Sequence, residues 1–403
     1  MLRPEQAGFR EGKSTTEQIF ILRNIIEQSI EWQATLYINF IDFEKAFDSI
    51  HQDSLWEIMR QYGIPRKIIS MVKLMYSGST CAVLDDGEVT EWFEVKTGVK
   101  QGCVMSGFLF LLAIDWIMTR TTNDNNTGIR WRFMSQLEDL DFADDIALLS
   151  ATHNQMQRKT NKMSDLAKKI GLKINDSKTK VLRINSKKND AVQLDGKDIE
   201  DVDEFTYLGA VVSKEGGGET DVKSRINKAR IAFTKLNKVW RSKQYGRKTK
   251  VKLYKTLVRP VLLYGCETWK MNKSDEEKLD SFQYQCLKRA LQIFWPNIVG
   301  MEELNKLTQL SKMSQEVKRR RWNWIGHVLR KQVGHHCDTA LTWQPDGKRK
   351  VGRPKTTWRR TIEKERDANG WKSWNEARVC AKDRQGWIQS VKALCATGHE
   401  DDR

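Results

Sequence analysis

The chain has 403 residues, with 69 Lys or Arg against 52 Asp or Glu, so its formal net charge is +17. Because 39% of the residues are hydrophobic, the chain can bury a core, which excludes global disorder, and its length predicts two or three domains. The sequence has no run of about 18 apolar residues and no apolar stretch at its start, which argues against a transmembrane helix and a signal peptide. Its 7 scattered cysteines lack close pairs, which fits a reducing compartment.

The sequence pattern in the first part of the chain predicts helices and short strands in alternation. Ser14 and Glu17 form a capping box, a pattern typical of a helix start. The apolar run over 36–43 predicts a buried strand. The pattern then predicts helices over 54–61 and up to about residue 76, a hairpin over 81–99 that turns at Asp85-Asp86-Gly87, an apolar helix over 107–118, and two strands about a tight turn over 137–150.

The rest of the chain becomes mainly helical after a glycine run. A basic helix over 155–170 ends at Gly171, and a strand pair flanks Asp195-Gly196. The run over 216–218 is the best linker candidate. Beyond it, the pattern predicts helices over 219–240, 248–269, 275–294 and 312–331, and then a loop-rich basic stretch from Gly347 to Lys355.

Charge is divided unevenly between these parts. Residues 1–150 contain 14 basic and 22 acidic residues, a net charge of −8, so residues 151–403 carry +25. A strongly basic region predicts a polyanionic partner, held through phosphate contacts. Acidic clusters in a chain that binds polyanions need a separate explanation, and divalent metal ions are the usual one.

Three carboxylates adjoin the apolar runs that predict strands. Asp144 and Asp145 lie at a predicted turn, where both side chains can approach one cation, and Asp42 ends the run over 36–43. Each also has an ordinary interpretation, because Asp-Asp pairs are common in surface turns and Asp42 can cap a helix that starts at Glu44. Together, three carboxylates from two segments could hold two divalent ions such as Mg²⁺, which prefer oxygen ligands and serve phosphoryl transfer.

Six blocks follow one another in the order 6–15, 39–48, 98–107, 142–145, 171–180 and 205–209, and together they resemble the motifs of non-LTR retrotransposon reverse transcriptases. Residues 39–48, Asn-Phe-Ile-Asp-Phe-Glu-Lys-Ala-Phe-Asp, resemble motif A, and Phe142-Ala143-Asp144-Asp145 is similar to the box of motif C. The other blocks resemble the segment joining fingers to palm (6–15), motif B (98–107), motif D (171–180) and motif E (205–209). Further stretches, over 240–269, 321–330 and 347–360, resemble the thumb, connector and C-terminal segment of an RTE-like or related LINE element.

The resemblance implies an α+β fold in three parts. These are a polymerase palm with a remnant of the fingers over 1–212, built on an antiparallel sheet with flanking helices, a helical thumb and connector over 219–300, and a basic, Trp-rich C-terminal region over 301–403. It implies an RNA-directed DNA polymerase that joins deoxynucleotides to a DNA primer 3′-hydroxyl on an RNA template, with target DNA supplying the primer. Asp42, Asp144 and Asp145 match the catalytic triad that binds two Mg²⁺ ions, or Mn²⁺ in their place.

The resemblance also assigns residues around the incoming nucleotide. Phe47 matches the steric gate that excludes ribonucleotides, Phe43 lies beside Asp42, and Gln101 and Gly102 match a loop against the nucleotide and template. Lys178 matches a lysine that acts as general acid toward pyrophosphate. Taken alone, Phe47 is equally typical of core packing, Gly102 of a turn, and Lys178 of a solvated surface.

Basic residues in the rear part are predicted to hold nucleic acid. The helix over 219–240 fits a thumb helix that tracks a phosphate backbone, and a solvated basic helix would share its pattern. The stretch over 348–355 resembles a nuclear localisation signal or a minor-groove arm, with Val351 where an AT-hook has Arg, and a generic basic loop fits as well. The residues assigned to nucleic acid are Lys223, Arg225, Lys228, Arg230, Lys348, Arg349, Lys350, Arg353 and Lys355, and Tyr207, Leu208 and Gly209 match the primer grip.

Residues 335–337, His-His-Cys, are the strongest hint of zinc. The other downstream cysteines, Cys380 and Cys395, are far away along the chain. Because structural zinc sites use closely spaced ligand pairs, no zinc site is expected.

Two departures from the family pattern bear on activity. The chain starts at the family's fingers–palm junction, without most of the fingers and without an endonuclease domain, and Ser106-Gly107 stands where the family has Ser-Pro. Losing Pro frees the backbone at a helix start. We therefore expect a fragment of an element. Because the sequence predicts neither a signal peptide nor a transmembrane helix, we expect the protein in the nucleus and cytoplasm and not in a membrane.

Two other functions compete with an active reverse transcriptase. The first is a catalytically silent remnant that only binds nucleic acid. The second is a different palm polymerase, such as a group II intron maturase or an RNA replicase. Replicases usually have Gly-Asp-Asp where this chain has Ala143-Asp144-Asp145, and they lack the Phe47 gate.

Overall fold

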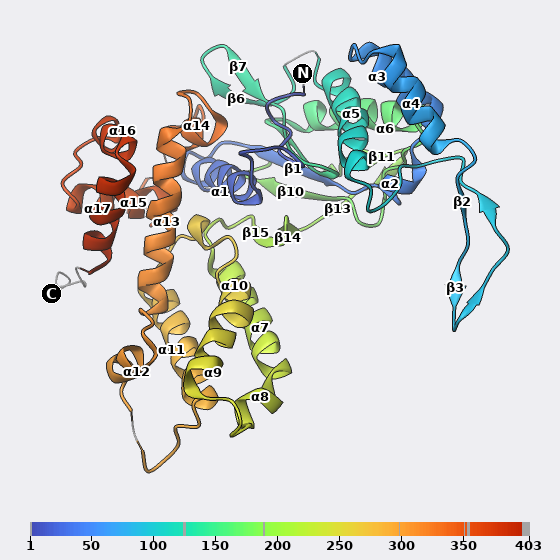
Figure 1. Cartoon of the computed structure of the whole chain (residues 1–403). Helices are drawn as coiled ribbons and strands as arrows, with labels where there is room; N and C mark the ends of the chain where they lie inside the picture. The colour runs from blue at the N-terminus through green and yellow to red at the C-terminus, as the bar shows by residue number, and fades with distance from the viewer. Residues whose placement is uncertain are drawn as a thin grey trace. The chain divides into compact units, whose positions relative to one another are not determined.

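The structure is a computed structural model that describes residues 2–123, 126–187, 190–297, 299–349, 351–352 and 355–396. Its contacts divide the chain into two compact units (Figure 1). Unit 1 consists of Met1–Gln18, Trp32–Leu208 and Pro345–Lys348, and unit 2 of Ile19–Glu31, Gly209–Gln344 and Arg349–Arg403.

Unit 1 is built on a five-stranded sheet in the order β13-β10-β1-β9-β8. Neighbouring strands are antiparallel, except that β10 and β13 are parallel. All six residues of the central strand β1 are buried, which explains why its sequence is a continuous apolar run rather than an alternation. The strands are β1 (Leu36–Ile41), β8 (Asp139–Phe142), β9 (Asp145–Ser150), β10 (Lys180–Ile184) and β13 (Glu200–Asp201).

Helices cover one face of the sheet, and α6 is the helix that contacts the strands directly. Helix α6 packs on β1 and β9, α5 packs on α6, and α3 packs on α5 and α4 (Figure 1). The side chain of Asn39 in β1 donates a hydrogen bond to Thr160 Oγ1 of α6 at 3.0 Å, so the polar residue inside the apolar strand has a partner. The bounds are α2 (Ala46–Ser49), α3 (Gln52–Gln61), α4 (Arg66–Tyr76), α5 (Val104–Thr121) and α6 (His153–Lys169).

Helix α5 is the most apolar element of unit 1. By length and composition it could cross a membrane, but 61% of it is buried, and the run from Leu109 to Ile114 lies in the hydrophobic core with β1 and α6 residues. Burial of this kind is what a core helix requires, because a helix that is apolar all round has no face for water.

Short hairpins decorate unit 1. The pairs are β2 (Thr80–Cys81) with β5 (Phe93–Glu94), β3 (Leu84–Asp85) with β4 (Glu88–Val89), β6 (Ile129–Arg132) with β7 (Ser135–Leu137), and β11 (Gln193–Leu194) with β12 (Lys197–Asp198). Figure 1 shows the β2–β5 segment as an arm that projects away from the sheet of unit 1. The last strand of unit 1 is β14 (Glu204–Tyr207), where Phe205 stacks on Phe40 of β1 with ring centroids 4.1 Å apart.

Unit 2 is mainly helical. A single hydrophobic cluster runs from Val222 to Val317 and contains the fully buried Trp240 and Trp269. Each indole has an acceptor: Trp240 Nε1 donates to Phe233 O and Trp269 Nε1 donates to Asp221, both at 2.7 Å. The elements are β15 (Ala210–Ser213), α7 (Glu219–Lys235), α8 (Asn237–Arg241), α9 (Arg247–Leu253), the π-helix η1 (Tyr254–Val258), α10 (Arg259–Leu262), the 3-10 helix η2 (Cys266–Thr268), α11 (Lys273–Ala290), α12 (Met301–Thr308) and α13 (Met313–Arg330).

Tryptophans form the core of the C-terminal helices. Trp371 and Trp387 stack at 4.5 Å with parallel rings, and Trp322 Nε1 donates to Glu365 at 2.6 Å. These rings are buried, so they stabilise the fold rather than present a stacking surface. The elements are α14 (His336–Thr342), α15 (Trp358–Ala368), α16 (Trp374–Lys382) and α17 (Arg384–Ala396).

The segment Ile19–Glu31 belongs to this core although it lies far upstream. It is the greater part of helix α1 (Thr15–Glu31), whose start confirms Ser14 as a cap, since Glu17 N donates to Ser14 Oγ at 3.4 Å. Phe20 makes edge contacts with Trp324 and Trp358 at 4.6 and 4.7 Å. A helix near the N-terminus thus completes the C-terminal core.

The α+β class and most predicted elements are confirmed. The structure adds a parallel pair, β10 with β13, to a sheet predicted as antiparallel. It also adds α12 and α14 to α17, which the sequence analysis did not predict, and the glycine run over 216–218 lies inside unit 2 rather than at the crossing between units. The three-part division into 1–212, 219–300 and 301–403 stays a prediction.

Candidate active site

Two adjacent strands bring the three predicted carboxylates to one end of the sheet. β1 and β9 are antiparallel with Ile41 opposite Ile146, so the next residues along, Asp42 and Asp145, stand opposite each other. Asp144 precedes Asp145 in the turn that joins β8 to β9. The strand register therefore unites residues that are about 100 positions apart in sequence.

Burial and neighbouring negative charge disfavour the ionisation of Asp144 and Asp145. Burial and the charges of Asp144 and Asp42 raise the pKa of Asp145 to about 6. Burial also raises the pKa of Asp144, and the charge of Asp42 adds to that shift. A bound cation would reverse this cost, because it favours the ionised form of all three groups.

The donor atoms fit a divalent metal ion. Asp42 Oδ1 is buried and accepts no hydrogen bond from the residues that the structure describes, and Lys178 Nζ lies 3.7 Å from it. Carboxylate oxygens are the ligands that Mg²⁺ and Mn²⁺ prefer. An orphaned oxygen beside two repelling carboxylates is what a site made for a hard cation would show without the ion.

One segment carries Lys178 and holds Asp42. Asn175 N donates to Asp42 O at 2.8 Å, and Asp42 N donates to Thr179 Oγ1 at 3.3 Å. Asn175 Oδ1 accepts from the backbone N–H groups of Ser177 and Lys178, both at 3.1 Å, which closes a tight turn. Asp42 and Lys178 are therefore placed by the same backbone contacts.

The loop predicted as motif B packs against α2. Gln101 Nε2 donates to Asp48 Oδ1 at 3.0 Å, and Val99 N donates to Phe47 O at 2.7 Å. A Cβ on Gly98 would lie 2.7 Å from the Asp48 backbone, so this close approach requires glycine. The loop and the Phe47 segment thus form one assembly.

The predicted nucleotide contacts are not equally accessible. Phe47 is half-buried and stacks on Phe110 with ring centroids 4.4 Å apart, and Gly102 is exposed with a φ of 82°. Phe43 is only 6% exposed and lies in the core of unit 1. The side chain of Phe43 therefore packs in the core, and the assignment of Phe43 to the nucleotide stays a prediction.

The predicted primer grip lies where the chain passes from one unit to the other. Tyr207 is buried in unit 1, and its hydroxyl donates to Leu140 O at 2.9 Å. Burial raises the pKa of Tyr207 well above its usual range, with Asp141 adding to the effect. Leu208 and Gly209 both have positive φ, 49° and 78°, which makes a tight turn.

Three of the four basic residues assigned on α7 are exposed. Lys223, Lys228 and Arg230 are open to solvent. Lys223 and Arg230 also line a groove of about 560 Å³ between α7 and α11. Arg225 is only 7% exposed, so it is not available to a phosphate backbone.

Arg225 acts inside unit 2 instead. Its guanidinium donates to Gly209 O, lies 3.8 Å from Asp221 and stacks over Tyr264 at 4.3 Å. Burial lowers the pKa of Arg225, although Asp221 opposes the shift. The prediction that Arg225 contacts nucleic acid is corrected: it joins α7 to the preceding turn.

The basic stretch near residue 350 is partly described. Lys348, Arg349 and Lys355 are exposed, and Arg349 forms an ion pair with Glu31 at 2.6 Å. Lys350 and Arg353 lie outside the described residues. The three described cations stay candidates for nucleic-acid contact.

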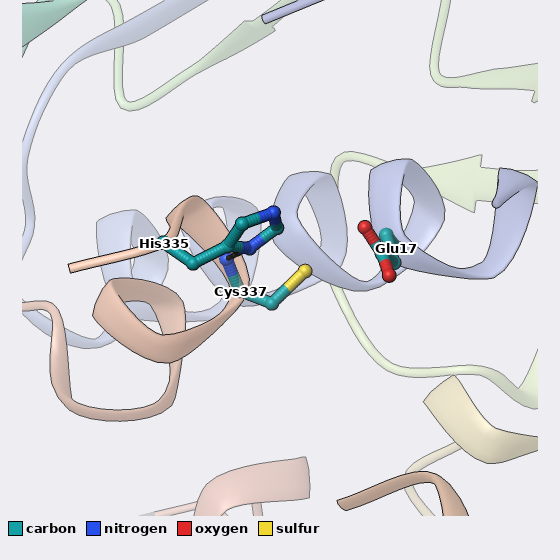
Figure 2. Close-up of side chains that lie close together, drawn as sticks. All are labelled: Glu17, His335 and Cys337. Carbon is teal, nitrogen blue, oxygen red and sulfur yellow. Dashed lines mark hydrogen bonds between the residues drawn. The ribbon is translucent and has the colours of Figure 1, made fainter. Parts of the chain in front are cut away.

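Figure 2 shows Glu17 on α1 and His335 and Cys337 at the start of α14. Glu17 belongs to unit 1, and the other two residues belong to unit 2. Within unit 2, His335 caps α14, since its Nδ1 accepts from Cys337 N at 3.3 Å. We assign no metal site to these residues.

Sequence reasoning missed Gln6 and Arg3, which contact the strands that carry the Asp-Asp turn. Gln6 bonds the backbone of Ala143, and Arg3 bonds Asp139 in β8. Gln6 lies in a block that resembles the family, but local pattern does not reveal which distant backbone a glutamine will meet.

Comparisons with known proteins bear on the family to which the chain belongs. Residues 1–212 match the family model described as reverse transcriptase (RNA-dependent DNA polymerase). A transposon-derived protein of Caenorhabditis elegans is 29% identical over 270 residues, which cover 64% of this chain and 95% of that protein. The retrovirus-related Pol polyprotein of the type-2 retrotransposable element R2DM of Drosophila melanogaster is 29% identical over 175 residues, 43% of this chain and 16% of the polyprotein.

Two further likenesses cover more of the chain. A Drosophila melanogaster protein named for the RNA-directed DNA polymerase of transposon BS is 23% identical over 371 residues, 86% of this chain and 38% of that protein. The chain thus spans well under half of these two fly proteins. Among solved structures, telomerase from Candida tropicalis with a fragment of telomeric RNA has a TM-score of 0.43 and 13% identity, over 96% of this chain and 53% of that one, a likeness too weak to carry an argument.

Proposed function

Because the chain belongs to the reverse transcriptase (RNA-dependent DNA polymerase) family, we propose that it is the polymerase region of a non-LTR retrotransposon protein and extends a DNA primer on an RNA template. Relatives named for such elements support this assignment, and what those longer proteins do as a whole is part of the proposal. In it, residues 1–212 form the palm with a remnant of the fingers, 219–300 the thumb, and 301–403 a basic C-terminal region. The protein would act in the nucleus and cytoplasm, where target DNA and template RNA occur.

The observation that carries the proposal is the opposition of Asp42 and Asp145 across β1 and β9, with Asp144 beside them. Burial raises the pKa of Asp145 to about 6, and the charges of Asp144 and of Asp42, which follows another strand, add to that shift. Clustered carboxylates with perturbed pKa values are typical of functional sites.

The triad would hold two divalent ions, Mg²⁺ or Mn²⁺. Bound there, such ions stabilise charge on the attacking 3′-oxygen and on the leaving pyrophosphate. The protein's own part is to present three ionised carboxylates in a fixed register, and to place Lys178 where it can donate a proton to the leaving group.

Other residues would position the substrates. Gln101, tied to Asp48, would lie against the nucleotide, and Phe47 would crowd a 2′-hydroxyl. Lys223, Lys228 and Arg230 on α7 would follow the phosphate backbone of the template–primer. Tyr207, Leu208 and Gly209 would support the primer end.

The test is primer extension on RNA with Mg²⁺, comparing the wild type with Asp144→Asn. We expect extension by the wild type and none by the variant. Asp53→Asn, which changes an exposed carboxylate on α3, is the matched control and should extend as the wild type does. Equal extension by Asp144→Asn and the wild type would sink the metal assignment.

Two further outcomes separate the alternatives. A silent remnant would bind nucleic acid with steep salt dependence and extend nothing. If the chain polymerises, Phe47→Val should raise the use of ribonucleotides relative to deoxyribonucleotides about 10-fold or more, while Phe47→Tyr keeps the ring and the discrimination. A wild type that prefers ribonucleotides would indicate a replicase instead.

A further inference from the structure

The N-terminal segment of unit 1 pairs with the edge of the sheet that carries the Asp-Asp turn. β8 is the last strand of the sheet, and Gln6 pairs with Asp141 in a parallel bridge. Ala7 N donates to Asp141 O at 2.8 Å. An edge strand offers unpaired backbone groups, and this segment satisfies some of them.

Within that segment, the buried side-chain amide of Gln6 makes two hydrogen bonds to the backbone of the turn. We call this pair of hydrogen bonds the clasp. Gln6 Oε1 accepts from Ala143 N at 2.8 Å, and Gln6 Nε2 donates to Ala143 O at 3.3 Å. Gln6 is fully buried, and Oε1 also accepts from Gly8 N at 2.8 Å. A Cβ on Gly8 would lie 2.3 Å from Ala143 N, so the two backbones touch.

Ala143 needs such support. Its φ is 57°, a left-handed conformation that residues other than glycine rarely adopt. A residue in this conformation persists where its surroundings over-determine it. The peptide groups of Ala143 set the direction in which the chain enters Asp144 and Asp145.

The clasp is itself anchored. The Arg3 guanidinium donates to Asp139 at 2.6 and 2.7 Å and also pairs with Asp141, and Arg3 N donates to Asp115 at 2.8 Å. Gln18 Nε2 donates to Glu5 O at 3.0 Å and to Asp141 O at 3.2 Å. These contacts tie the segment to β8, to Asp115 on α5 and to Gln18 on α1, so the segment has partners besides the turn itself.

We propose that Gln6 is a positioning residue that holds the left-handed Ala143 and so keeps Asp144 and Asp145 in register with Asp42. The inference rests on the proposed function for its catalytic consequence, but the clasp can be measured without activity. A displacement of about 1 Å at reacting groups can cost about 100-fold in rate, so a small movement of the turn is enough to matter.

The decisive comparison is Gln6→Met against Gln18→Met. Both substitutions replace a buried glutamine that bonds backbone groups around β8, and only Gln6 touches Ala143. In Gln6→Met we expect amide hydrogen exchange over 142–146 to rise about 10-fold or more, as for a lost buried hydrogen bond. We also expect Mn²⁺ binding by the triad to weaken about 10-fold, and primer extension to fall by a similar factor or more. Gln18→Met should change all three much less than Gln6→Met does, because it leaves both hydrogen bonds between Gln6 and Ala143 in place.

Other results would overturn the proposal. If Gln6→Met folds and matches Gln18→Met in exchange and in Mn²⁺ binding, the segment is only a cover for the edge strand. Should Gln6→Met fail to fold, Gln6→Asn keeps the amide but is one methylene shorter, so it cannot make both bonds to Ala143, and unchanged exchange at the turn in that variant would equally reject the clasp. Faster exchange and weaker Mn²⁺ binding in a chain that extends no primer would keep the clasp and reject the polymerase.

Discussion

The two units carry charge in opposite ways. In unit 1, strand register brings three carboxylates together, and burial, with the charges of Asp144 and Asp42 adding to it, raises the pKa of Asp145 to about 6. In unit 2, cations such as Lys223, Lys228 and Arg230 are spread over the exposed surface of α7. The properties of a carboxylate cluster depend on where each carboxylate lies, whereas binding by a dispersed cationic surface depends on how many cations it has.

Arg225 shows that residue type alone does not separate the two behaviours. It belongs to the same helix as the exposed cations, yet it is buried against Asp221 and Tyr264. A charged group that is buried and paired contributes to the fold, and removing one partner leaves an uncompensated charge.

The largest expected effect comes from a substitution in the carboxylate cluster of unit 1. Asp42→Asn removes one of three carboxylates, and we expect primer extension to fall about 100- to 1,000-fold, since metal-based charge stabilisation supplies several kcal/mol. Steady-state extension assays should show this loss without a change in template–primer affinity. A loss of primer extension below about 10-fold would mean that Asp42 does not act together with Asp144 and Asp145.

Lys178→Met should have the next largest effect, a fall of about 10- to 100-fold in the rate of nucleotide addition if Lys178 is the general acid. Lys173→Met is the matched control, because both lysines are about two-thirds exposed and each faces a carboxylate of the segment after β1. Rapid-quench measurement of single additions checks this. Equal losses in the two variants would reduce Lys178 to a surface ion pair.

Substituting three exposed cations of α7 together should have a smaller effect than substituting one carboxylate of the triad. The triple variant Lys223→Ala, Lys228→Ala and Arg230→Ala should lower template–primer affinity about 10-fold at moderate salt and reduce the slope of log K against log salt by about 2 to 3. Filter binding over a salt series measures both. Alanine at the exposed Lys306, Lys372 and Lys392 removes the same charge elsewhere in unit 2, and an equal change in slope there would show that no particular face is used.

The smallest effect is on stability without metal. An Asp with a raised pKa destabilises the fold when ionised, so stability falls as pH rises from about 4 to 6 and stays lower above that. Asp145→Asn should therefore stabilise the metal-free protein at neutral pH, by about 1 kcal/mol once solvent screening is allowed for, and should do nothing near pH 4.

Urea unfolding in the presence of a chelator measures this difference. Adding Mg²⁺ should then stabilise the wild type more than the variant, because the ion binds the folded triad. A variant that is less stable than the wild type at neutral pH would show that the carboxylates are not in conflict.

Much of unit 1 was predictable because its local signals agree with its packing. The run over 36–43 predicted β1, and the two apolar stretches around Asp144 and Asp145 predicted β8 and β9. The helices after α13 were not predicted, because their apolar residues are sparse and their core is made by tryptophans that stack on residues far along the chain.

The sequence by itself determined which residues are the candidates for the chemistry: Asp42, Asp144 and Asp145 stand at ends of apolar runs within blocks that resemble one family. Tertiary structure alone decided which of their neighbours are accessible. Phe43 and Arg225 turned inward, and Gln6 came to hold Ala143. The physical reason is that side-chain identity and periodicity are local, whereas burial and hydrogen-bond partners depend on strand register and on segments that meet only after folding.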